Sequence, residues 1–221
     1  MSVLMEREID KLKKKILSIG TLVEENVRRS IQTIKNMDKK VVEEVIQIDD
    51  TIDQCEVEIE EECLKILALH QPVAIDLRFI IAVLKINNDL ERVGDHAVNI
   101  VNHTIALHQK HQGRFDFDFK EMVDKVQQML KNSLDALVNL DSDLAKRVMI
   151  ADDEVDNLHR QMYVKVEESI KSDKESTGYM MNMMQISRNL ERIADLSTNI
   201  AEDVYYMING DIIRHKGDLV I

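Results

Sequence analysis

The chain has 221 residues and a formal net charge of −12, with 41 Asp and Glu against 29 Lys and Arg, which makes nucleic acid an unfavourable partner. It contains only six Gly, one Pro, four Phe, four Tyr and no Trp, whereas β-sheet proteins need turn residues at every reversal and aromatic or β-branched residues in their strands. All-β and doubly wound folds are therefore nearly excluded, and the composition predicts an all-α protein with few, long helices.

Three long helices are predicted in the first half of the chain. Apolar residues recur at three- to four-residue spacing from the start of the sequence and predict a first helix of about 35 residues that ends near Asn36. Asp38 is a suitable N-cap for a second helix, whose predicted inner face ends at Leu69. The only proline, Pro72, breaks the helix before it and suits the start of the next, so a third helix is expected to reach about His108.

The second half of the chain repeats this plan. A helix is predicted over residues 117–140, followed by one that Asp141 caps. A polar stretch at 172–178 separates it from a last helix that ends near Asn209. The complete prediction is six long helices in two sets of three.

The strongest internal match supports a duplication. Residues 90–95, Leu-Glu-Arg-Val-Gly-Asp, recur 100 residues later as Leu-Glu-Arg-Ile-Ala-Asp at 190–195. A second match pairs Asp-Asp-Thr-Ile-Asp at 49–53 with Asp-Asp-Glu-Val-Asp at 152–156. Each match falls on the corresponding predicted helix of its half, so the chain is interpreted as a tandem duplication of one three-helix unit.

A break in composition separates the two copies. Residues 109–116 contain Gly113 and carry no helical apolar stripe, which is typical of a linker. We therefore predict two tandem, pseudo-symmetric three-helix bundles, residues 1–112 and 113–221.

The two cysteines predict a reducing compartment. Cys55 and Cys63 lie eight residues apart in one predicted helix, a separation of about 12 Å that is too long for a disulfide. Reduced thiols are typical of cytoplasmic proteins. The first residues lack the apolar core of a signal peptide, and no segment approaches 18 uncharged apolar residues, so the protein is expected in the cytoplasm and at membranes only through protein partners.

Each duplicated segment carries two carboxylates four residues apart, a spacing that places both on one face of a helix. The sequence has seven such pairs, no more than its acidic content gives by chance, but four of them lie in the duplicated segments. These four pairs are Asp49/Asp53, Glu91/Asp95, Asp152/Asp156 and Glu191/Asp195.

The positions of the pairs predict two carboxylate clusters. Asp53 lies 18 residues before Gln71 and Glu91 lies 20 residues after it, so an antiparallel hairpin brings both to nearly the same level, and similar arithmetic holds for the second half. Four clustered carboxylates stay ionised only if a cation sits among them or if they face water. Oxygen-only ligation suits Mg²⁺, Mn²⁺, Ca²⁺ or iron. We predict a divalent or iron-type metal cofactor on these eight residues, with Fe, Zn, Mg and Mn all left open.

Alternative roles remain for the same residues. The acids can form a solvated face of a purely structural scaffold, and Arg92 and Arg192 can neutralise them as salt bridges or bind an anion. Asn99 and Asn199 lie one turn beyond each motif, where they can support a metal site or form hydrogen bonds between helices.

Catalytic motifs are scarce in this sequence. It has no Gly-rich phosphate loop, no nucleophile elbow and no zinc-binding Cys/His spacing. Asp156 and His159 have the spacing of a di-iron ligand pair, but a ferritin-like oxidase needs Glu-x-x-His on two helices. We predict that the protein is not an enzyme, with a metal-dependent hydrolase or oxidase that uses the clustered carboxylates as the alternative.

The duplicated Leu-Glu-Arg-(Val/Ile)-(Gly/Ala)-Asp motifs, together with Tyr205-Tyr206, Gly210 and Arg214-His215, resemble the PhoU family of phosphate-transport and phosphate-signalling regulators over essentially the whole chain. The resemblance implies a six-helix, often homodimeric protein. It also implies metal clusters on the eight acidic residues named above, with Asp in the first motif of each half where the family can have Glu.

The function implied by this resemblance is negative regulation of phosphate uptake and of phosphate-starvation signalling. The implied partners are components of a phosphate ABC transporter and a sensor histidine kinase, which the protein would couple when phosphate is plentiful.

Overall fold

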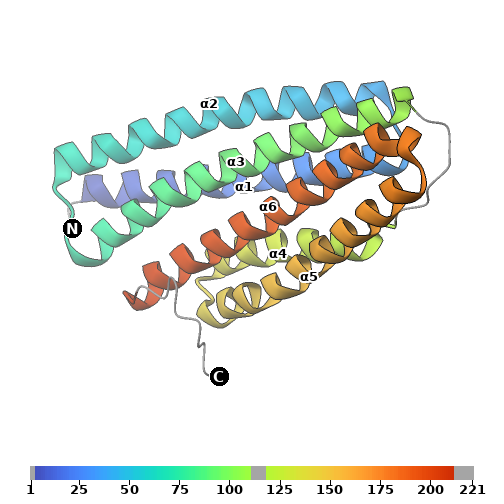
Figure 1. The fold of residues 1–221 in the computed structure, drawn as a ribbon. Coiled ribbons are helices and arrows are strands. Elements are labelled where there is room, and N and C mark those ends of the chain that lie inside the picture. The colour runs from blue at the N-terminus through green and yellow to red at the C-terminus, as the bar shows by residue number, and fades with distance from the viewer. Residues whose placement is uncertain (1–2, 111–117, 212–221) are drawn as a thin grey trace.

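The computed structural model describes residues 3–110 and 118–211. These residues form six α-helices and one short 3-10 turn, with no strand among them (Figure 1). The all-α prediction is confirmed. The elements are α1 (Val3–Lys35), α2 (Lys39–His70), α3 (Ala74–Lys110), α4 (Lys120–Asn139), α5 (Ser142–Ser172), η1 (Lys174–Ser176) and α6 (Thr177–Asn209).

The helices form two three-helix bundles joined along one long interface. Helices α1, α2 and α3 pack on one another, as do α4, α5 and α6, and the bundles meet mainly where α3 lies along α6 (Figure 1). Helix α1 also contacts α4, and the apolar cores of both bundles form one continuous cluster. The predicted boundary between residues 112 and 113 lies outside the described residues.

Side-chain caps fix two of the helix starts as the sequence predicted. Asp38 accepts a hydrogen bond from the backbone N–H of Lys40, and Asp141 accepts from those of Asp143 and Leu144. Pro72 lies in the short connection before α3 rather than in its first turn. Leu69 is 66% exposed, so its prediction as an inner-face residue is wrong; it lies in the last turn of α2, where that helix ends.

The apolar positions of the duplicated motifs are buried in the core that the two bundles share. Leu90 and Val93 on α3 and Leu190 and Ile193 on α6 are all fully buried in the shared core. Because these side chains face inward, helical geometry turns the acidic positions between them toward α2 and α5. The core therefore determines where the carboxylates lie.

Candidate metal centres

Two histidine contacts fix the register between α3 and α6. His96 Nδ1 lies 2.9 Å from Asn189 Oδ1, and His103 Nδ1 lies 3.0 Å from Asn182 Oδ1. These pairs require the two helices to run antiparallel, as Figure 1 shows. The register brings residues 91–95 and 191–195 to the same level, so the two carboxylate motifs lie on either side of one helix crossing.

The first cluster lies between α2 and α3 and contains Asp49, Asp53, Glu91 and Asp95. Burial and the nearby charges of Asp53, Asp95 and Glu91 raise the pKa of Asp49 to about 7. Burial and the neighbouring Asp95 also raise the pKa values of Asp53 and Glu91. The four carboxylates of the hairpin arithmetic thus lie near one another, with Asp53 and Asp95 exposed, but no three of them offer oxygens within 4.8 Å of one another.

Asp49 is the most constrained member of this cluster. Its Oδ1 atom is buried and finds no hydrogen-bond donor among the described residues. None of the four carboxylates forms an ion pair within that part of the chain. A buried, unpaired carboxylate oxygen beside three further acids is costly without a cation, so this donor set fits a divalent metal ion.

Gly94 allows α2 and α3 to approach each other closely beside Asp49. The sequence pattern alone did not predict this close approach. A Cβ atom added to Gly94 would lie 2.6 Å from Asp49 Oδ1 and 3.4 Å from Ile52 Cδ1. The second motif has Ala194 at the corresponding position. The difference between Gly94 and Ala194 was the feature of the sequence that could have indicated this close approach of the helices.

Replacing Gly94 with Ala is expected to give less than the gain of about 1 kcal/mol in the free energy of unfolding that this change ordinarily brings in a helix, because the new methyl group would displace the Asp49 carboxylate. Urea unfolding of the metal-free protein measures the change. The matched variant Ala194→Gly should cost only about 1 kcal/mol, the ordinary helix penalty of glycine. A Gly94→Ala protein that gains the full helix contribution of about 1 kcal/mol would show that the close approach does not constrain Asp49.

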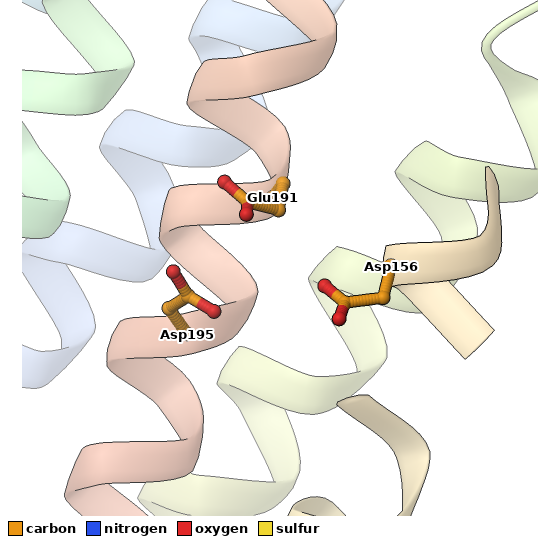
Figure 2. Close-up of side chains that lie close together, drawn as sticks. All are labelled: Asp156, Glu191 and Asp195. Atoms are coloured by element: carbon orange, nitrogen blue, oxygen red, sulfur yellow. The ribbon is translucent and has the colours of Figure 1, made fainter. Parts of the chain in front are cut away.

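The second cluster lies between α5 and α6. Figure 2 shows Asp156 on α5 facing Glu191 and Asp195 on α6, and one carboxylate oxygen from each of these residues lies within 4.8 Å of the others. Burial, followed by the charges of Asp195 and Asp156, raises the pKa of Asp152 to about 6. The Asp152 Oδ1 atom is also buried. The nearby Thr198 hydroxyl makes no hydrogen bond of normal geometry to it, and no other described residue supplies a donor.

The two motif arginines occupy different positions relative to their clusters. Arg192 Nη1 lies 2.8 Å from Asp195 Oδ2, and Arg192 Nε lies 3.7 Å from a Glu191 oxygen. Arg92 Nη1 instead lies 3.5 Å from Asp89 Oδ1, one turn before its cluster. The predicted alternative of a salt bridge therefore occurs at Arg192 but not between Arg92 and the first cluster.

The remaining candidate residues lie around the clusters. Asn99 is exposed and Asn199 is half-buried, and their supporting roles stay predictions. His159 Nδ1 lies 2.8 Å from Ser187 Oγ, and burial lowers the pKa of His159. A hydrogen bond at Nδ1 holds the imidazole ring in a fixed orientation.

The metal-free protein is expected to become less stable as the pH rises from about 5.5 to 8. The folded protein holds the Asp49 proton up to about pH 7, whereas the unfolded chain releases it near pH 4. This stability is present at acidic pH and is lost as the pH rises through about 7. The raised pKa of Asp152 contributes stability at acidic pH in the same way, and this contribution is lost as the pH rises through about 6. The combined loss, discounted for solvent screening, is about 1–2 kcal/mol.

Urea unfolding at several pH values measures this loss. The variant Asp49→Asn/Asp152→Asn should have a flatter pH profile and exceed the wild type in stability at pH 8. Parallel profiles for the two proteins would contradict the assignment of the pH dependence to these carboxylates.

No described helix is long and apolar enough to cross a membrane.

Comparison with known proteins gives one consistent result. The family model described as "PhoU domain" matches residues 16–104 and 119–204. A protein of Pseudomonas aeruginosa named "Phosphate-specific transport system accessory protein PhoU homolog" is 35% identical over 211 residues, covering 95% of this chain and 87% of that protein. A protein of the same name from Aquifex aeolicus is 34% identical, covering 95% of both chains.

Two solved structures superpose on this chain over nearly its whole length. The crystal structure of PhoU from Pseudomonas aeruginosa superposes with a TM-score of 0.89 at 34% identity, covering 93% of this chain and 99% of that one. The structure of the "phosphate transport system regulatory protein PhoU" from Streptococcus pneumoniae gives a TM-score of 0.86 at 27% identity, covering 95% and 99%.

Proposed function

The chain belongs to the PhoU domain family, and from this premise we propose that it is a non-enzymatic regulator that restrains phosphate uptake and phosphate-starvation signalling. The observation that carries the proposal is similarity over nearly the full length to relatives named as accessory proteins of phosphate-specific transport. These names give no support to the alternative of a metal-dependent hydrolase or oxidase.

The proposed partners are components of a phosphate ABC transporter and a sensor histidine kinase, which this protein couples in the cytoplasm. Its net charge of −12 disfavours direct binding to anionic lipid, so contact with the membrane is through these proteins. The proposal includes a homodimer, as the family resemblance implies, and sedimentation of the purified protein tests that part.

Metal binding on the eight clustered carboxylates is the second part of the proposal. The buried, unpaired Asp49 oxygen and the space that Gly94 leaves for it support a cation at the first cluster. Asp156, Glu191 and Asp195 converge at the second cluster. A bound ion would neutralise the carboxylates, while the residues themselves tie α2 to α3 and α5 to α6, giving rigid hairpins from which a docking surface can be built.

Alkaline phosphatase activity in phosphate-rich medium tests the regulatory role. Deletion of the gene should raise this activity, and the wild-type gene should return it to a low level. A variant with Ala at Glu91, Asp95, Glu191 and Asp195 then shows whether the acidic motifs are needed for repression. Low activity in the deletion strain would contradict the proposed role in phosphate signalling.

A further inference from the structure

The duplicated motifs are nearly identical in sequence, but their arginines point in opposite directions along their helices. Arg92 on α3 pairs with Asp89, three residues before it. Arg192 on α6 pairs with Asp195, three residues after it and inside the second carboxylate cluster. The second cluster therefore contains an internal cation, whereas the first has none among the described residues.

One substitution between the copies accounts for this difference. Asp89 is a buried carboxylate, 7% exposed, whose Oδ1 lies 3.5 Å from Arg92 Nη1. The corresponding residue in the second copy is Asn189, which carries no charge. Its Oδ1 accepts from His96 and its Nδ2 donates to the Gln185 carbonyl. Asn189 therefore gives Arg192 no counter-charge, and the nearest one is Asp195.

Arg192 also acts electrostatically on both acids that α6 contributes to the second cluster. Burial raises the pKa values of Glu191 and Asp195, and the positive charge of Arg192 opposes this rise at both residues. At the first cluster, burial and neighbouring carboxylates raise the pKa of Glu91, and Arg92 opposes this rise less than each of them contributes to it. A divalent cation that enters the second cluster competes with Arg192 for Asp195, whereas one that enters the first cluster competes with no ion pair of the described residues.

We infer that the two clusters bind divalent cations unequally. The α2–α3 cluster fills first, because Asp89 holds Arg92 away from it, and the α5–α6 cluster fills second, because Asn189 leaves Arg192 paired with Asp195. This inference rests on the proposed metal binding. Displacement of a half-exposed ion pair costs about 1 kcal/mol, so the two affinities should differ roughly fivefold or more.

The test uses two single-cluster proteins and Mn²⁺, whose free concentration is read by electron paramagnetic resonance. The α2–α3 protein has its second cluster neutralised by Asp152→Asn, Asp156→Asn, Glu191→Gln and Asp195→Asn. The α5–α6 protein has its first cluster neutralised by Asp49→Asn, Asp53→Asn, Glu91→Gln and Asp95→Asn. The α2–α3 protein is expected to bind Mn²⁺ more tightly, roughly fivefold or more.

Substitutions of the arginines and of the residues that orient them then test the cause. In the α5–α6 protein, Arg192→Gln and Asn189→Asp should each raise Mn²⁺ affinity roughly fivefold. In the α2–α3 protein, Asp89→Asn should lower affinity because Arg92 is released toward the carboxylates, and the matched variant Arg92→Gln should have a smaller effect than Arg192→Gln. Arg192 is half-exposed, so its replacement tests the inference even if Asn189→Asp fails to fold.

A double-mutant cycle excludes a simple charge effect. If Asn189→Asp acts by moving Arg192, it should add almost nothing in a protein that already carries Arg192→Gln. Equal affinities in the two single-cluster proteins, or additive effects in the cycle, would overturn the inference while the metal-binding proposal stands. Absence of bound Mn²⁺ in both proteins would overturn the metal-binding proposal and this inference together, whereas the alkaline phosphatase result would still decide the regulatory role.

Discussion

Saturating Mn²⁺ is expected to raise the free energy of unfolding of the metal-stripped protein by about 3 kcal/mol once free metal exceeds its dissociation constant 100-fold. A shift of this size raises the melting temperature by about 6–12 °C in a chain of this length. The reason is that burial, and after it the neighbouring carboxylates, raise the pKa values of Asp49, Asp152 and Glu191, so the folded protein holds these carboxylates at a cost that a cation removes.

Thermal unfolding with and without Mn²⁺ measures the shift. A variant with all eight carboxylates replaced by their amides is the control for metal bound elsewhere. It should melt at a higher temperature than the metal-free wild type, because the repulsion is gone, and should not respond to Mn²⁺. If instead both proteins gained equal stability from the metal, the clusters would not be its binding sites.

The helices could be predicted because local signals agree with the tertiary contacts. The sequence predicted Asp38 and Asp141 as N-caps, and in the structure they cap α2 and α5. The predicted end of the last helix at Asn209 is also the end of α6, where Gly210 follows in the left-handed conformation. Leu69 was misassigned because apolar periodicity does not show where a helix projects beyond the core that covers it.

The carboxylate clusters could be predicted in outline but not in detail. Counting residues on either side of a turn places four acids at one level, because the rise per residue of a helix is constant. The approach of Asp49 to Gly94 depends on the distance between helices, which counting does not give. The opposite directions of Arg92 and Arg192 depend on partners that only the docking of α3 against α6 determines, such as His96 for Asn189.

Truncation of Leu90 to Ala is expected to lower the free energy of unfolding by about 3 kcal/mol. Leu90 is fully buried in the shared core on α3, between Asp89 and Glu91, and loss of a buried isobutyl group removes apolar burial and leaves a cavity. Chemical unfolding measures the change. Leu64→Ala on α2 is the matched control: that side chain is 54% exposed, so its loss should cost less than about 0.5 kcal/mol.

The Leu90→Ala variant also tests whether the core positions the first cluster. Since Leu90 packs this part of α3 into the shared core, its truncation should weaken Mn²⁺ binding at Asp49, Asp53, Glu91 and Asp95 even under conditions where the protein remains folded. Circular dichroism confirms folding at each metal concentration, and Leu64→Ala should retain wild-type affinity. An unchanged affinity in folded Leu90→Ala protein would mean that the α2–α3 hairpin positions its carboxylates without support from the core packing of Leu90.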